Sequence, residues 1–389
     1  MSNEKFDEFV DKLQKEIIEK EIQDHNERIV ELFHNPPNWG KPPDEEITAS
    51  KSYENDRKET MEFFLKINDN DRIERANFLT DGCGCMVATG SQTTLLIEGK
   101  SIEHVENLQP EDIDDALNGL PDGEKHHAEL AISILRRLIE DYIIEKELIE
   151  EHVDIPVEDD KINLKGTIYY SQNTLPKAPF IINMAGFGDH RESYFVKLFS
   201  KKFANAGFYV LTYDYRAHGE TALQTRKNIA KLMKNIFIDI KSVIKWVLEK
   251  QNERLLEENI VLFGRSFGGA IILTQGYIDE RIKLLIPLCT RFDYHTVPSV
   301  RFSDEDIEFV SPKYYLKKDP KNNERILIAH CRDDDRIPFN DLLQIKEQLG
   351  LKNENVIIYK TGKHAFSGNR YDLFRRSIEF INKKLNIIR

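Results

Sequence analysis

The spacing of apolar residues follows two different patterns along the chain. Up to residue 149, apolar residues recur at helical spacing, and two short apolar runs flank a polar turn. Apolar residues three and four positions apart share one face of a helix, whereas short runs beside turn residues are typical of strands. This part is therefore predicted to be a small α+β unit with an antiparallel hairpin. Its expected helices are 6–33, 85–98 and 126–149, and its expected strands are 62–67 and 72–79.

After residue 150 the pattern changes to short apolar runs that alternate with amphipathic segments. Most runs are nearly continuous, as expected of strands that are buried on both faces. This alternation favours an α/β fold with a mostly parallel, doubly wound sheet, and it divides the chain into domains 1–149 and 150–389. The expected strands are 165–171, 179–185, 209–214, 259–264, 283–288, 326–331 and 356–360. The expected helices are 194–206, 227–250, 267–277, 340–348 and 371–385.

Composition and charge limit the class of protein. The chain has 389 residues, of which 40% are apolar, and a formal net charge of −12. It can therefore fill more than one core, and its acidity disfavours nucleic acids and anionic membrane surfaces as partners. The first residues do not resemble a signal peptide, and no apolar run is long enough to predict a membrane span. With only four cysteines, two of them one residue apart, we expect a reduced, cytoplasmic protein without disulfides.

A candidate nucleophile lies between a predicted strand and a predicted helix. Residues 264–268 read G-R-S-F-G, an instance of G-x-S-x-G with Ser266 at its centre. Glycines are needed beside the serine because so tight a turn leaves no room for neighbouring side chains. The turn lifts the hydroxyl above the sheet, next to a helix N-terminus that stabilises negative charge. The alternative is an ordinary glycine-rich turn, but the strand-turn-helix context favours a nucleophile.

An acid and a base follow Ser266 in the chain order expected of this type of sheet. Three acids, Asp333, Asp334 and Asp335, come directly after a predicted strand, and His364 lies in the loop after the next one. A serine hydroxyl is a weak nucleophile until a base takes its proton, and a carboxylate keeps that base in the useful tautomer. The spacing therefore predicts a histidine base with one of the three acids as its partner.

A second glycine-bracketed turn supplies a candidate oxyanion hole. Phe187 lies between Gly186 and Gly188, directly after the predicted strand 179–185. Its backbone N–H is expected to be one donor and that of Phe267 the other. Each such donor accelerates acyl transfer by on the order of 10²–10³.

Residues 153–385 resemble the α/β-hydrolase superfamily, most closely its small esterase and serine-aminopeptidase-like members. Apart from G-x-S-x-G, the resemblance rests on residues 213–220, which are similar to D-x-R-G-x-G-x-S, and on 330–338, which are similar to H-G-x-x-D-x-x-V-P. It implies that Asp334 is the catalytic acid and that its two acidic neighbours are solvated. It also implies cleavage of a small-molecule ester or amide through an acyl-enzyme, without a cofactor. The implied triad is Ser266, Asp334 and His364.

The first part of the chain has a candidate metal site. Cys83 and Cys85 lie where a predicted strand meets a predicted helix, and His126 and His127 begin the last helix of this part. Thiols at a helix N-terminus have a lowered pKa, and thiolates are the form that binds iron or zinc. The alternative is a small buried cysteine pair beside a solvated histidine pair.

Residues 20–145 resemble the N-terminal family of U-type iron–sulfur cluster scaffolds, IscU and NifU. The resemblance implies a small α+β fold with a three-stranded antiparallel sheet, and iron–sulfur assembly proteins as partners. The segments that carry it are 26–30, 35–40, 81–84, 97–102, 119–121 and 126–131.

The resemblance also assigns the family's ligand positions. The family uses three cysteines; Cys83 keeps its place, Arg57 stands at the first position and His127 at the third. Glu59 replaces a nearby aspartate, and Cys85 is an additional thiol. The implied ligands Cys83, Cys85 and His127 are suited to zinc or iron or, with Glu59, to a labile iron–sulfur cluster.

Two functions are compatible with these features. The first is a serine hydrolase fused to a scaffold-like domain, which the complete triad favours. The second is an iron–sulfur cluster assembly or metal-binding protein whose hydrolase domain is accessory. Two missing scaffold cysteines weaken the second.

Overall fold

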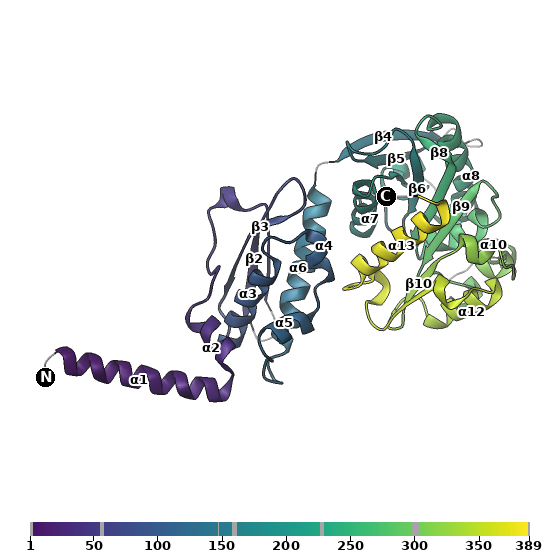
Figure 1. Cartoon of the computed structure of the whole chain (residues 1–389). Helices are drawn as coiled ribbons and strands as arrows, with labels where there is room; N and C mark the ends of the chain where they lie inside the picture. The colour runs from purple at the N-terminus through teal and green to yellow at the C-terminus, as the bar shows by residue number, and fades with distance from the viewer. Residues whose placement is uncertain are drawn as a thin grey trace. The chain divides into compact units, whose positions relative to one another are not determined.

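The computed structural model describes residues 3–54, 58–146, 148–157, 162–225, 229–297 and 303–387. They form two compact units, Met1–Glu145 and Lys146–Arg389, which are coloured purple to blue and blue to yellow in Figure 1. Each unit has its own sheet, and the two are described separately below. Among the described residues, no helix combines the length and the apolar character needed to cross a bilayer.

The first unit begins with two helices, α1 (Asn3–Asp24) and α2 (Glu27–His34), where the sequence predicted one helical stretch over 6–33. The break falls at Asn26, whose side chain accepts the backbone N–H of Ile29 at 3.0 Å. Asparagine is a favoured N-cap because its side-chain oxygen satisfies an N–H group that has no partner within the helix. The cap therefore starts a new helix inside a continuous apolar pattern.

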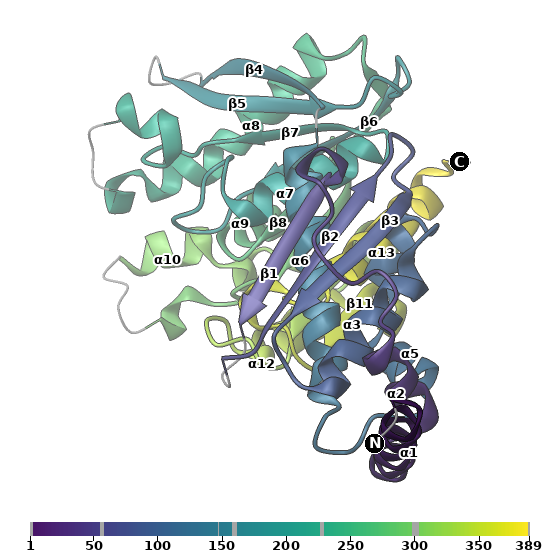
Figure 2. The same cartoon turned by 90° about the vertical axis from the view of Figure 1, so that its left-hand side faces the viewer.

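A three-stranded antiparallel sheet follows, in the order β1-β2-β3, and Figure 2 shows its strands side by side. The predicted hairpin is confirmed as β2 (Thr60–Ile67) and β3 (Ile73–Thr80), and β1 (Ala49–Glu54) is an additional edge strand. Helices α3 (Gly84–Ile97) and α6 (His126–Glu145) pack against the sheet. The α+β fold of this unit is thus confirmed, although α6 ends before residue 149. The short helices α4 (Ile102–Asn107) and α5 (Pro110–Ala116) complete it.

The second unit is built on an eight-stranded sheet in the order β11-β10-β9-β8-β6-β7-β5-β4. Strands β6 to β11 pair in parallel, and β5 and β4 continue the sheet in antiparallel fashion. The predicted α/β fold with a mostly parallel sheet is confirmed. Only β4 was not expected. The strands are β4 (Ile149–Pro156), β5 (Asn163–Tyr170), β6 (Ala178–Met184), β7 (Tyr209–Tyr213), β8 (Leu255–Arg265), β9 (Ile282–Leu288), β10 (Ile328–Cys331) and β11 (Val356–Tyr359).

Helices cover both faces of this sheet. Ile181 and Ile182 are adjacent in β6, yet they belong to different core clusters, because neighbouring side chains of a strand point to opposite faces. One cluster contains α8 and the other contains α7 and α13. The sheet is therefore doubly wound. The helices are α7 (Tyr194–Asn205), α8 (Met233–Lys250), α9 (Phe267–Ile271), α10 (Asp304–Val310), α11 (Asn322–Arg325), α12 (Phe339–Leu349) and α13 (Arg370–Leu385).

Candidate active site and candidate metal centre

The candidate nucleophile turn joins the end of β8 to the start of α9. Ser266 adopts a φ of 58°, in the left-handed region that residues with a side chain rarely enter. A Cβ atom at Gly268 would lie 2.7 Å from the carbonyl oxygens of Met184 and Ala185. Only glycine therefore lets the turn approach the end of β6 so closely. Backbone strain of this kind is concentrated at functional positions.

The candidate acid and base come from loops after two neighbouring strands, β10 and β11. His364 Nδ1 lies 2.8 Å from Asp334 Oδ2, and both side chains are almost fully buried. The other carboxylate oxygen accepts the backbone N–H groups of Arg336 and Ile337, each at 2.9 Å. Burial raises the pKa of Asp334, but the hydrogen bonds from His364 and the backbone outweigh it and hold that pKa well below its ordinary 3.8. Asp334 is therefore ionised and orients the imidazole.

The serine lies at the same edge of the sheet as the acid and the base. Strands β8, β9, β10 and β11 are parallel, so the loops after them meet at the carboxyl edge. Arg265, which precedes Ser266, donates to the carbonyl oxygen of His364 at 3.5 Å. Within the described residues, Ser266 Oγ and the imidazole share no hydrogen bond, which is common in such sites before substrate binds.

Asp333 is more than the solvated neighbour that the resemblance implied. Its side chain is exposed, yet it accepts the backbone N–H groups of Gly362 at 3.2 Å and Lys363 at 2.9 Å. Lys363 directly precedes His364, so this carboxylate holds the loop that carries the candidate base. Asp335 is exposed as well.

Two buried side chains that the sequence analysis did not assign lie beside the acid. His330 Nε2 is 3.0 Å from the carbonyl oxygen of Ile337 and 3.4 Å from Asp334 Oδ2. Burial lowers the pKa of His330, so a neutral ring joins the two ends of the loop that carries Asp334. The sulfur of Cys289, directly after β9, lies within 4.8 Å of side-chain atoms of Asp334 and His364.

The two predicted oxyanion donors are neighbours. Phe187 belongs to the turn after β6, and Phe267 is the first residue of α9, where backbone N–H groups have no partner within the helix. Their rings meet edge to face, with centroids 5.7 Å apart, and the ring of His218 lies 6.0 Å from that of Phe187. Phe187 is 57% exposed, whereas Phe267 is buried. The candidate oxyanion hole therefore has aromatic walls, one of which faces solvent.

In the first unit, a thiol, an imidazole and a carboxylate converge where β3 leads into α3. The sulfur of Cys83, at the N-cap of α3, lies 3.3 Å from Nε2 of His127, in the first turn of α6. Glu124 Oε2 is 2.7 Å from the same nitrogen and 3.7 Å from the sulfur. His127 is fully buried, and Cys83 is exposed. The three atoms are close enough for one metal ion to reach them all.

Cys83 is the acidic thiol of the pair. A hydrogen bond from Cys85, followed by one from His127, lowers the pKa of Cys83 to about 3. The interaction with Cys83, together with burial, raises the pKa of the Cys85 thiol. Cys83 is therefore the thiol of the pair that loses its proton more readily, and the thiolate is the form that binds zinc or iron.

The other predicted ligands lie around this centre without joining it. Cys85 is buried, and its sulfur lies 3.6 Å from Nδ1 of His25. Glu59 forms a second group of potential ligands with His126 and His127, within 4.8 Å of one another. His127 is thus the side chain that the two groups share.

Glu124 was not predicted as a ligand. Its position three residues before His127 is the feature of the sequence that could have indicated it. It lies in the turn that leads into α6, so a helix-like spacing brings both side chains to one place. Arg57, which the resemblance put in place of a cysteine, lies outside the described residues.

The side chains that could coordinate a metal at Cys83 determine which ion or cluster this centre suits. One thiolate, one imidazole and one carboxylate fit a single zinc or iron ion with an open coordination position. A [2Fe–2S] cluster is usually held by four thiolates, and the described residues near Cys83 include only one further thiol, which is protonated. The centre therefore fits a mononuclear ion and does not fit a cluster held by four thiolates.

Comparison with known proteins relates the first unit to iron–sulfur scaffolds. Residues 24–148 match the family model described as NifU-like N terminal domain. The iron–sulfur cluster assembly scaffold protein IscU of Aquifex aeolicus is 34% identical over 135 residues, which cover 34% of this chain and 85% of that protein. IscU of Escherichia coli is 30% identical over 125 residues, covering 32% of this chain and 97% of that protein.

The second unit matches a hydrolase family. Residues 176–321 match the family model described as Serine aminopeptidase, S33. An acylaminoacyl peptidase of Pyrococcus horikoshii is 21% identical, with a TM-score of 0.47; the similarity covers 60% of this chain and only 42% of the peptidase. Est1E of Butyrivibrio proteoclasticus with ferulic acid is 18% identical, with a TM-score of 0.48, over 61% of this chain and 99% of that protein. The chain thus belongs, through its first unit, to the NifU-like family of iron–sulfur cluster assembly scaffolds, and it joins that unit to an α/β unit that is similar to the serine aminopeptidase family of hydrolases.

Proposed function

We propose that the second unit is an active serine hydrolase that cleaves an ester or amide of a small substrate through an acyl-enzyme. The observation that supports this most directly is the 2.8 Å contact between His364 and an ionised Asp334, at the sheet edge that carries the strained Ser266. A carboxylate that is buried and hydrogen-bonded to a histidine favours the tautomer whose Nε2 can accept a proton. Ser266, Asp334 and His364 are the proposed triad.

The proposed reaction follows from these positions. Ser266 Oγ attacks the carbonyl carbon while His364 Nε2 takes its proton, and Asp334 stabilises the imidazolium that results. The N–H groups of Phe187 and Phe267 donate to the oxyanion of the tetrahedral intermediate. His364 then protonates the leaving alcohol or amine, and a water molecule activated by the same imidazole hydrolyses the acyl-enzyme. No step requires a cofactor.

Covalent labelling tests this proposal. A fluorophosphonate probe should label the wild type, and Ser266→Ala should abolish both labelling and turnover of p-nitrophenyl esters. Ser242→Ala, the same chemical change on α8, is the matched control and should leave both unchanged. Undiminished labelling of Ser266→Ala would refute the proposed nucleophile.

We infer a second function for the first unit, the binding of a single zinc or iron ion by Cys83, His127 and Glu124. The support is the convergence of the three atoms within 4.8 Å and the lowered pKa of Cys83. Bound there, the ion would be cargo for iron–sulfur assembly proteins, the partners that the family suggests. A reducing compartment such as the cytoplasm is part of this proposal, because the thiol must stay free.

Metal analysis of anaerobically purified protein tests the second function. We expect about one zinc or iron per chain in the wild type and none at this site in Cys83→Ala. Cys331→Ala, in the second unit, is the matched control and should retain the metal. A metal-free wild type would contradict the inference, and the visible absorbance of an iron–sulfur cluster would favour cluster assembly with an accessory hydrolase instead.

A further inference from the structure

Two arginine–aspartate pairs hold the turn that carries Phe187, residues 185–191, against the rest of the unit. The turn contributes the aspartate to one pair and the arginine to the other. Asp189 of the turn pairs with Arg265, and Arg191 of the turn pairs with Asp214. We propose that Asp189 and Arg265 are positioning residues that hold this oxyanion turn against the nucleophile turn. The inference rests on the proposed hydrolase function, because it concerns the donor at Phe187.

The first pair links three parts of the candidate site. Arg265 Nη2 lies 2.8 Å from Asp189 Oδ2, and its Nη1 donates to the carbonyl oxygen of His364 at 3.5 Å. The guanidinium also packs on the ring of Phe195, 4.5 Å from its centroid, and the side chain is only 10% exposed. Since Arg265 directly precedes Ser266, one side chain joins the oxyanion turn, the nucleophile turn and the loop of the base.

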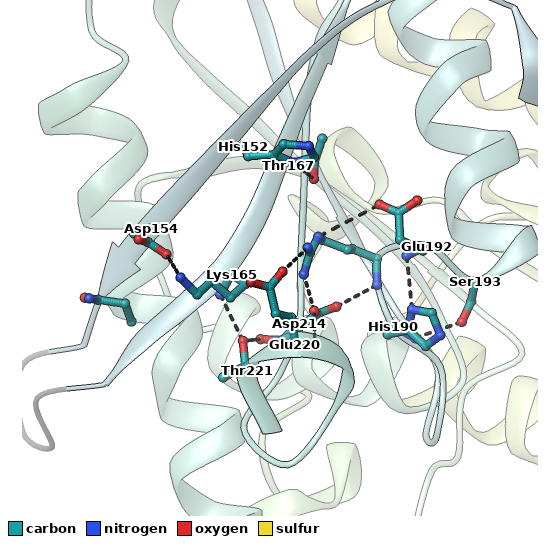
Figure 3. Close-up of polar contacts among 12 residues, drawn as sticks. His152, Asp154, Lys165, Thr167, His190, Glu192, Ser193, Asp214, Glu220 and Thr221 are labelled. Atoms are coloured by element: carbon teal, nitrogen blue, oxygen red, sulfur yellow. Dashed lines mark hydrogen bonds and ion pairs between the residues drawn. The ribbon is translucent and has the colours of Figure 1, made fainter. Parts of the chain in front are cut away.

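The second pair anchors the far end of the turn, and Figure 3 shows the polar network around it. Asp214, directly after β7, is almost fully buried and accepts both the backbone N–H of Arg191, at 2.8 Å, and its guanidinium. Arg191 also donates to Glu220 at 2.5 Å, and the N–H of Glu220 donates to Asp214 at 2.8 Å. A Cβ atom at Gly219 would lie 2.3 Å from the Asp214 carboxylate, so this close network requires glycine there.

Two hydrogen bonds hold the turn between these pairs. The hydroxyl of Tyr215 donates to the carbonyl oxygen of Ala185 at 2.9 Å, and the N–H of Gly188 donates to Nε2 of His218 at 3.3 Å. The backbone is thereby held two residues before Phe187 and one residue after it. An oxyanion donor is effective when it need not reorganise as charge develops, so fixing its backbone raises the rate of the chemical step.

The two pairs differ in what they connect. The pair of Arg191 joins the turn to the loop after β7, whereas the pair of Asp189 reaches the segment that carries Ser266. Loss of the Asp189 charge should therefore change the distance between the oxyanion donor and the nucleophile. A misplacement of about 1 Å costs on the order of 100-fold in rate, mainly in kcat, because substrate binding does not depend on this donor.

Steady-state kinetics of Asp189→Asn and Arg265→Lys on p-nitrophenyl acetate test the proposal. We expect kcat and the rate of fluorophosphonate labelling to fall about 10–100-fold, with KM within about threefold of the wild type. Asp189→Glu, which keeps the charge, should recover part of kcat. Asp279→Asn is the matched control, because Asp279 pairs with Arg281 at the opposite, amino end of β9, and it should leave kcat unchanged.

The outcomes separate this inference from the proposed function. If Asp189→Asn and Arg265→Lys keep the wild-type kcat while Ser266→Ala loses it, the positioning role is refuted and the hydrolase stands. If Ser266→Ala keeps activity, the proposed function itself fails. If Asp189→Asn folds poorly, Arg265→Lys decides alone, because it keeps the buried charge. The inference would also be overturned if the control Asp279→Asn lost as much kcat and as much melting temperature as Asp189→Asn.

Discussion

Both units place a candidate reactive side chain where a strand turns into a helix, but its surroundings differ between the two units. Ser266, between β8 and α9, has a strained backbone with φ of 58°, whereas Cys83, between β3 and α3, has an ordinary φ of −68°. A hydroxyl needs an aimed base and a confined approach before it reacts. A thiol needs only neighbours that favour its charge, and Cys85 and His127 provide these.

The contrast extends to the number of chain segments involved. The candidate triad draws on loops after three different strands, and two ion pairs hold the turn that carries Phe187. The candidate metal centre needs one N-cap, the start of one helix and the turn that leads into that helix. The candidate triad should therefore be sensitive to changes that shift the backbone, and the candidate metal centre to changes that remove a donor.

The largest effect that would test this contrast is expected from His364→Gln. Loss of the base leaves Ser266 without a proton acceptor, so kcat should fall by on the order of 10⁶. Measurement of p-nitrophenyl ester turnover checks this, with His104→Gln in α4 as the control. Near wild-type turnover in His364→Gln would mean that another group serves as the base.

Asp334→Asn should have the next largest effect. An amide favours the wrong imidazole tautomer, and we expect kcat to fall about 10⁴-fold with KM little changed. Asp335→Asn removes the same charge from an exposed neighbour and should leave kcat near that of the wild type. Comparable losses in the two variants would count against Asp334 as the triad acid.

At the candidate metal centre, His127→Ala should weaken metal binding by more than the roughly 10–100-fold cost of losing an outer partner of a metal ligand. Glu124→Gln should weaken it less, because a neutral oxygen remains. Competition with a chromogenic chelator measures both affinities, and Glu129→Gln, in the same helix, is the control. An unchanged affinity in Glu124→Gln would remove it from the ligand set.

Glycine substitutions compare the backbone sensitivity of the two units. Gly268→Ala forces a Cβ atom to within 2.7 Å of two carbonyl oxygens and should lower the free energy of unfolding by about 1–3 kcal/mol. A Cβ atom at Gly123, beside the candidate metal centre, meets nothing within 4 Å, so Gly123→Ala should be nearly neutral. Urea denaturation measures both, and equal effects would contradict the contrast.

The smallest effect concerns the pH dependence of stability. The folded-state pKa of Asp334 lies below its ordinary 3.8, so the carboxylate stabilises the fold above about pH 4, and this contribution is lost as the pH falls through the folded-state pKa. The stability difference between the wild type and Asp334→Asn should therefore shrink from about pH 7 to about pH 3. Urea titrations at both pH values check this; a constant difference would be inconsistent with the lowered pKa.

Strand prediction succeeded where a strand is rich in apolar residues and failed for two polar strands at sheet edges. Strand β6 is buried throughout and appears in the sequence as a continuous apolar run. The two strands that were missed, β1 and β4, are edge strands with mostly exposed, polar side chains. Edge strands often carry charged residues that prevent further pairing, so they lack the apolar signal.

The sequence alone determined the parts of this protein that depend on local backbone chemistry and chain order. G-x-S-x-G, the order of serine, acid and histidine, and the thiol at a helix start are all readable from residue types and short spacings. Only the tertiary structure decided which side chains support them: Asp333 and His330 beside the acid, Glu124 beside Cys83, and the pair of Asp189 and Arg265. These contacts join segments that meet only because whole helices and strands pack together. The spacing of residues over a short stretch of sequence does not predict that packing.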